Sequence, residues 1–101
     1  MNVITKVSEI SYTDIAEYIR LDSEVAQDEK NTLNNLITVA TEYIKSYTGL
    51  SGEQIDLHPD FVIVVLILCQ DMYDNRTMYV DNDNLNQVVE TILGMHAVNL
   101  L

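Results

Sequence analysis

Several residue types are scarce in this 101-residue chain, and each scarcity excludes a class of structure. There is no tryptophan, and one phenylalanine, one proline and three glycines leave little turn-forming material for a loop-rich β-sandwich. The single cysteine, Cys69, has no partner for an intramolecular disulfide and lies inside an apolar run. We therefore expect it to be a small buried hydrophobic residue and not a nucleophile. The composition favours a single all-α domain spanning residues 1–101.

Positive charge is the second shortage. Five Lys and Arg residues face 16 Asp and Glu residues, which gives a formal net charge of −11. Such a surface repels phosphate, so tight binding to exposed nucleic acid and association with an anionic membrane are both unfavourable. Two interpretations of the acidity stay open. In the first, the negative charge only keeps the protein soluble. In the second, it binds a basic partner or lines a space through which DNA must pass without sticking.

Long hydrophobic segments are also missing, although one short run stands out in "HPDFVIVVLILCQDMYDNR" (residues 58–76). Residues 61–69 are all apolar, yet a membrane helix needs roughly 20 such residues. The start of the chain, "MNVITKVSEI", has no apolar core of a secretory signal, so we expect the protein to stay in the cytosol where it is made. The β-branched residues of the run suit a strand, but Pro59 at its start and the polar spacing after Cys69 favour a helix from Pro59 to Asn75.

A helix that is apolar on all sides must be covered on all sides. Two arrangements are open: the rest of the chain covers the helix completely, or part of its surface faces another subunit. The apolar end of the chain, "MHAVNLL" (residues 95–101), is a second segment able to dock onto a neighbour. The candidate subunit or partner interface therefore comprises eight residues: Val62, Val65, Ile67, Tyr73, Arg76, Met95, Val98 and Leu100.

Three further helices are expected around the apolar one, which makes a small bundle of about four helices. An extended arm (residues 1–11) precedes a short helix (residues 11–20) capped by Ser11 or Thr13. A long helix follows within residues 21–50, with apolar residues at spacings of three and four and a stop at Gly49. After a loop (residues 51–60) and the apolar helix, a last amphipathic helix spans residues 84–94, with Asp83 or Asn84 as its cap and Gly94 as its stop.

No set of residues in the sequence has the spacing of a catalytic, cofactor or metal site. His58 and His96 each lack a cysteine or second histidine at metal-ligand spacing, and we expect His96 to make a tail contact. Asp71 and Asp74 share a helix face and are expected to be solvated, while Arg76 is expected to pair with a carboxylate or cap the helix end. There is no glycine-rich phosphate loop. We therefore expect no enzyme activity, no cofactor and no metal.

Three segments in this order resemble one known family. They are "IRLD" (residues 19–22) after the short helix, "LITVATEYIKSYTG" (residues 36–49) in the long helix, and "MYDNR" (residues 72–76) at the end of the apolar helix. "EYIKSYTG" is the most specific of them. Together they are similar to the small head–tail connector, or head-completion adaptor, proteins of long-tailed bacteriophages and prophages. The resemblance spans roughly residues 5–95, and it departs at the C-terminus, where many relatives are longer or more basic.

The resemblance implies a structural subunit without catalysis, assembled with itself into a ring of about a dozen copies. Such a ring lies below the portal protein at the head–tail junction of the virion and extends the DNA channel toward the next connector, stopper or tail protein. DNA passes through without specific binding, no membrane is involved, and the subunit resides in the host cytoplasm before assembly. The stretches 22–29 and 54–60 are candidates for the lumen-facing acidic surface.

The acidic composition also allows a different class of function. The alternative is a small acidic regulator, or a DNA-mimic inhibitor, that binds one basic host protein. Such a complex would weaken steeply with added salt, because its attraction is electrostatic.

Overall fold

The regular elements of the computed structural model, which describes residues 4–97, are all helical. In chain order they are η1 (Val7–Glu9), α1 (Tyr12–Tyr18), α2 (Ser23–Asp28), α3 (Lys30–Thr48), α4 (Gly52–Ile55), α5 (Asp60–Asp74), η2 (Asn82–Asn84) and α6 (Gln87–His96). The predicted all-α bundle is confirmed, with α1, α3, α5 and α6 as the expected short, long, apolar and C-terminal helices. No helix within residues 4–97 is long and apolar enough to cross a membrane.

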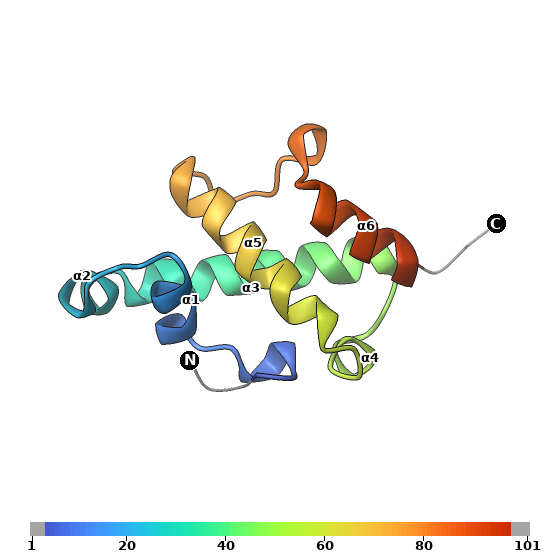
Figure 1. Ribbon diagram of the computed structural model, residues 1–101, viewed down its shortest axis with the longest axis horizontal. Helices are drawn as coiled ribbons and strands as arrows, with labels where there is room; N and C mark the ends of the chain where they lie inside the picture. The colour runs from blue at the N-terminus through green and yellow to red at the C-terminus, as the bar shows by residue number, and fades with distance from the viewer. Residues whose placement is uncertain (1–3, 98–101) are drawn as a thin grey trace.

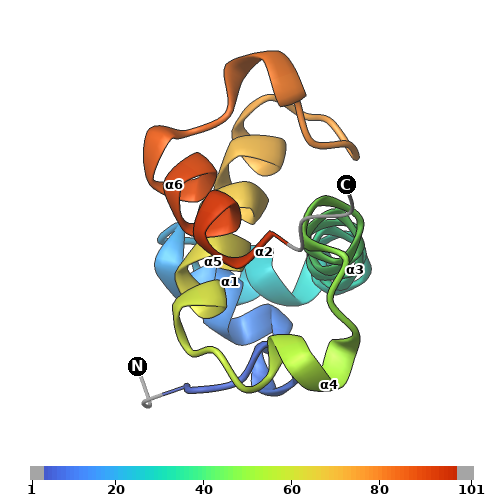
Figure 2. The ribbon, with the colours of Figure 1, turned by 90° about the vertical axis from the view of Figure 1, so that its right-hand side faces the viewer.

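Helices α3 and α5 form the frame of the molecule. The long α3 runs along the longest axis, and α5 crosses it diagonally (Figure 1). Viewed from the end, α5 lies in the middle, with α3, α6 and α1 around it (Figure 2). The contacts agree, since α5 packs against α1, α3, α6 and η1. The most apolar helix of the chain is therefore also the most central one.

The chain itself covers α5 on almost every side. Within the apolar run 61–69, only Ile63 and Ile67 are partly exposed, and the other members are buried. They pack against Ile15 of α1, a stripe of α3, and Val89 and Leu93 of α6. The α3 stripe comprises Leu33, Leu36, Ala40 and Ile44. Of the two arrangements left open by the sequence, the structure therefore favours an internal core helix.

Cys69 behaves as the sequence predicts. Its thiol is fully buried within the core, and this burial raises the pKa of Cys69 to about 12. A thiol that stays protonated at neutral pH is a poor nucleophile, so Cys69 serves as a small apolar side chain.

The expected single long helix is two helices, and this part of the prediction is wrong. The break lies at Glu29, which ends α2 and begins α3 with φ −103° and ψ 18°. Between the buried residues Ala26 and Leu33 the sequence is entirely polar, so no continuous apolar face holds one straight helix. The chain turns at this point, and α2 packs against both α1 and the start of α3.

The N-terminal segment is less extended than predicted. Residues 7–9 form a 3₁₀ turn, and Val7 and Ile10 are buried in the core. The backbone N–H of Ser8 donates a hydrogen bond to the Asp56 carboxylate at 3.1 Å. Hydrogen bonding from the Ser8 side chain is the main cause that lowers the pKa of Asp56, and this backbone bond adds to it, because both favour the ionised form. The segment 4–10 is thus attached to the bundle.

The N-terminal caps of α1, α4 and α6 are side-chain hydrogen bonds to nearby backbone groups, and the sequence predicted only some of them. Ser11 caps α1 in a capping box with Asp14, as expected. A second capping box, Ser51 with Gln54, starts α4 inside the segment predicted as a loop. Helix α6 begins at a different cap from the two predicted, because Asn86 accepts the N–H of Val88 at 2.8 Å. It also continues through the expected stop at Gly94 and ends at His96.

Helices α1, α3 and α5 each end at a residue in the left-handed conformation. The three residues are Arg20 (φ 62°), Gly49 (φ 77°) and Arg76 (φ 55°), and no other residue within 4–97 has a positive φ. After α1, the N–H of Leu21 donates to the carbonyl of Ala16 at 2.9 Å, which completes a Schellman motif. Glycine is the usual residue at this position, so both arginines carry a conformational cost of roughly 1–2 kcal/mol.

We expect Arg20→Gly to stabilise the protein by roughly 0.5–1 kcal/mol. The substitution removes the left-handed strain of an exposed side chain, and the greater freedom of glycine in the unfolded chain offsets part of the gain. Urea unfolding followed by circular dichroism measures the change. Arg20→Ala is the control, because it removes the same side chain but keeps the strain. An equal gain in both variants would show that the charge, and not the backbone, was responsible.

Candidate interaction surfaces

Two residues of the predicted interface are part of the core, so that part of the prediction is wrong. Val65 is fully buried, and Val62 is only 9% exposed. Both were chosen because an apolar helix needs cover, and the packing of α1, α3 and α6 against α5 provides that cover within one chain. Neither side chain therefore offers surface to a neighbouring subunit.

The other predicted interface residues lie near the surface or outside the described part of the chain. Ile67 and Tyr73 are partly buried on α5, whereas Arg76 and Met95 are exposed. Val98 and Leu100 lie outside the described residues 4–97. An interface role for the four described residues stays a prediction.

A shallow groove of about 360 Å³ lies beside the C-terminal end of α5. Arg76 stacks over the ring of Tyr73, with 4.8 Å between the guanidinium carbon and the ring centroid. The neighbouring Glu29 carboxylate raises the pKa of Tyr73. The groove is lined by Thr32, Leu36, Met72, Tyr73, Arg76, Thr77 and Met78. It thus combines an apolar floor with a single cation.

The left-handed backbone of Arg76 ends α5 beside this groove. Its N–H donates to the carbonyl of Tyr73, and the N–H of Thr77 donates to the carbonyl of Met72 at 2.9 Å. These two bonds form a Schellman motif that ends α5 and turns the chain sharply. Of the two sequence-based expectations for Arg76, the structure supports a role at the helix end, which Arg76 fills through its backbone one residue after the cap Asn75.

Five of the seven large exposed apolar residues in the described chain lie toward two ends of the molecule, and the other two, Val25 and Val88, lie on α2 and in the first turn of α6. The first group is Tyr47 in the last turn of α3, Leu57 after α4 and Met95 in the last turn of α6. Figure 1 shows that these three elements converge at one end of the long axis. Leu57 and Met95 are 75% and 67% exposed. We call this group the α6-end surface.

The second group follows α5, whose C-terminal end points away from the first group (Figure 1). Met78 and Tyr79 are 46% and 64% exposed there, next to the groove that holds Arg76. We call Met78, Tyr79 and the groove the α5-end surface. Contiguous apolar surface is typical of protein–protein contacts, so these two groups are candidates for such contacts.

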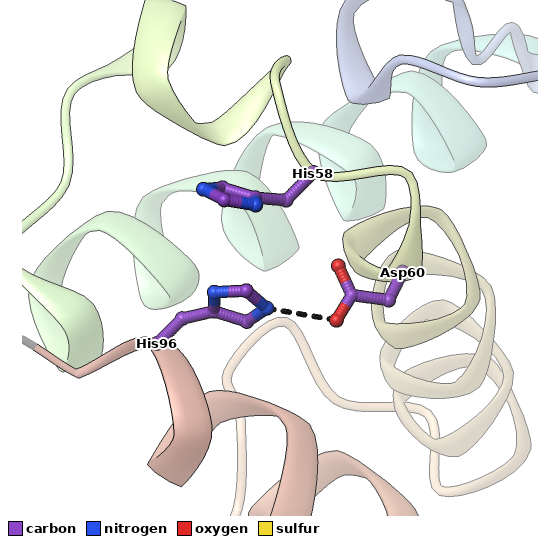
Figure 3. Close-up of side chains that lie close together, drawn as sticks. All are labelled: His58, Asp60 and His96. Atoms are coloured by element: carbon purple, nitrogen blue, oxygen red, sulfur yellow. Dashed lines mark hydrogen bonds and ion pairs between the residues drawn. The ribbon is translucent and has the colours of Figure 1, made fainter.

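The two histidines, which the sequence presents as isolated, lie together in the fold. Their ring centroids are 4.4 Å apart, and Nε2 of His96 lies 2.8 Å from Oδ2 of Asp60 (Figure 3). The sequence gives no signal for this cluster, because Asp60 and His96 are 36 positions apart. Only the packing of α6 against α5 brings them into contact.

Comparison with known families gives one result, which covers nearly the whole described chain. The model of the phage gp6-like head-tail connector protein family matches residues 10–97. The chain belongs to this family. A search of the curated proteins and a search of the solved structures each gave no significant match. The resemblance inferred from the three sequence segments is thereby confirmed.

The three segments that resemble the connector family share one structural property. Each contains one of the three left-handed helix ends: Arg20 in "IRLD", Gly49 in "EYIKSYTG" and Arg76 in "MYDNR". The family pattern in this connector therefore marks the points at which helices stop and the chain reverses. Family membership makes the chain a structural phage protein and a virion component.

Proposed function

We propose that this connector subunit forms a closed ring at the junction of the phage head and tail, between the portal protein and the next connector, stopper or tail protein. The family match over residues 10–97 carries this proposal. It favours a structural role over the alternative of an acidic regulator that inhibits a host protein.

The positions of the exposed apolar residues support ring formation. The α6-end surface and the α5-end surface differ in composition and lie apart on the molecule (Figure 1). When one surface of a subunit binds a different surface of its neighbour, the contact is heterologous, and repeated contacts close a ring if the rotation permits. A two-fold dimer would instead need one surface that is complementary to itself. Two unlike surfaces therefore fit a ring.

The strong negative charge supports a role as a DNA conduit. DNA carries about one negative charge per 1.7 Å, so an acidic wall lets it slide where a basic wall would retain it. Asp22, Glu24 and Asp28 are exposed on and beside α2. In contrast, Asp56 and Asp60 already bind Ser8 and His96. Of the two acidic stretches noted in the sequence, we therefore assign residues 22–29 to the lumen.

The test is assembly of the purified chain with the portal protein of the same phage. Sedimentation velocity should show a species of many subunits, either at high protein concentration or only when portal is present. Binding should depend weakly on salt, because apolar contacts dominate it. A chain that stays monomeric at every concentration and does not bind portal would contradict the proposal. A complex with one basic host protein that dissociates steeply with salt would instead support the regulator.

A further inference from the structure

We propose that His58, Asp60 and His96 form a binding site for one divalent transition-metal ion, of which Zn²⁺ fits best. The site would link the segment before α5 to the last turn of α6. This inference goes beyond the connector role and does not depend on assembly.

The geometry of the three side chains carries the proposal. One ligand atom from each residue lies within 4.8 Å of the other two. Around a tetrahedral Zn²⁺ ion with bonds of about 2.1 Å, ligand atoms lie roughly 3.4 Å apart. The His96–Asp60 pair is already closer than this, at 2.8 Å. Figure 3 shows the two rings on the same side of the Asp60 carboxylate. A rotation of the His58 ring, together with a slight opening of the His96–Asp60 pair, would bring three ligand atoms to this spacing.

The backbone holds two of the ligands in position in advance. His58 and Asp60 flank Pro59, whose φ of −60° is fixed by its ring. The N–H of His58 donates to the carbonyl of Ile55, and the N–H of Phe61 donates to the carbonyl of His58, both at 3.1 Å. Such bonds fix the turn before α5. They lower the entropy cost of gathering the ligands.

The third ligand comes from a rigid helix anchored in the core. Val89 and Leu93 of α6 are fully buried, and the His96 ring lies 4.7 Å from the ring of buried Phe61. The His96 side chain is 19% exposed, so its ring is largely enclosed while the Asp60 carboxylate keeps access to solvent. An ion could enter from the solvent side and keep a water molecule as its fourth ligand.

The donor set favours a transition metal over Mg²⁺ or Ca²⁺. Two imidazoles and one carboxylate suit Zn²⁺, Co²⁺ or Ni²⁺, whereas the alkaline-earth ions prefer oxygen ligands in larger number. The net charge of −11 draws cations to the protein in general. Asp60 lies in the first turn of α5, whose helix dipole opposes a cation, so its carboxylate must offset that effect. When the ion binds, its bonds to His96 and Asp60 would take the place of the hydrogen bond between these two side chains.

A bound ion would fix parts of the α6-end surface. Leu57 directly precedes His58, and Met95 directly precedes His96. The ion would thus tie together the two segments that present the most exposed apolar side chains of the described chain. These segments are otherwise joined at this point by the His96–Asp60 contact and by ring packing.

Titration of the untagged chain with Co²⁺ and Zn²⁺ at neutral pH tests the site. We expect one ion per chain, visible absorption bands of tetrahedral Co²⁺, and displacement of Co²⁺ by Zn²⁺. The melting temperature should rise by roughly 10 °C at an ion concentration of about 100 Kd. His58→Gln and His96→Gln should each lower the affinity at least about 100-fold, more than the loss of an outer-shell partner usually does.

His96→Gln also separates the proposal from a simple hydrogen-bonded contact, because glutamine still donates to Asp60 but binds zinc poorly. Its melting temperature without ions should stay near that of the wild type. Asp60→Asn should lose the ion, whereas Asp83→Asn, which removes the same charge from an exposed position, should keep it. The proposal is overturned if the wild type shows no saturable binding, if His58→Gln binds as well as the wild type, or if Ca²⁺ and Mg²⁺ compete equally.

Discussion

Val65→Asp is expected to unfold the protein or to leave it with a small fraction of its stability. Val65 is fully buried at the centre of α5, where α1, α3 and α6 surround the helix. Among the described residues no Lys or Arg is buried in this core, so the new carboxylate would have no cation to pair with. The cost of a buried and unpaired charge is several kcal/mol, out of a total of about 5–15 kcal/mol for a domain of this size.

Two matched variants make the result interpretable. Gln70→Asp adds the same charge to the same helix at a partly exposed position. Its free energy of unfolding should lie within about 0.5 kcal/mol of the wild-type value. Val65→Ala should lower the free energy of unfolding by about 2 kcal/mol and remain folded, so the urea midpoint can be measured. A Val65→Asp protein with the wild-type midpoint would show that Val65 does not lie in the core.

Charges placed on the two end surfaces are expected to abolish assembly without affecting the fold. Met95→Asp alters the α6-end surface, and Met78→Asp alters the α5-end surface. Substitutions at exposed positions usually change the free energy of unfolding by less than about 0.5 kcal/mol. Within an interface the same charge would be buried and unpaired, at a cost of several kcal/mol per contact. Sedimentation velocity with portal should therefore show no ring for either variant.

A mixture of the two variants tests whether the contact joins unlike surfaces. Each variant keeps one intact surface, and the two intact surfaces are complementary in a heterologous contact. Equal amounts should therefore form a dimer of one chain of each kind and no larger species. Homodimers of either variant alone would indicate a self-complementary contact and contradict the proposed ring. Asn35→Asp adds the same charge to the exposed polar face of α3 and should assemble normally.

Much of the fold follows from local sequence patterns. The spacing of Leu33, Leu36, Ala40 and Ile44 predicts the buried face of α3, and Gly49 marks its end because glycine adopts a positive φ without strain. Ser11, one of the two caps that the sequence offered, starts α1. Local patterns succeed at these points because the deciding hydrogen bonds and torsions involve residues within one or two turns. The expectation of one long helix failed at Glu29, where an entirely polar stretch interrupts the apolar face and α2 packs against both α1 and α3.

The sequence by itself determined the helical class, the identity of the central helix and the family, because each depends on residue order or on the apolar excess of one segment. Only the tertiary structure decided which apolar residues are exposed. It placed Val62 and Val65 in the core and left Leu57 and Met95 on the surface. It also brought His58 and Asp60 to His96 across 36 positions or more, since the docking of α6 onto α5 is a long-range contact that no local pattern encodes.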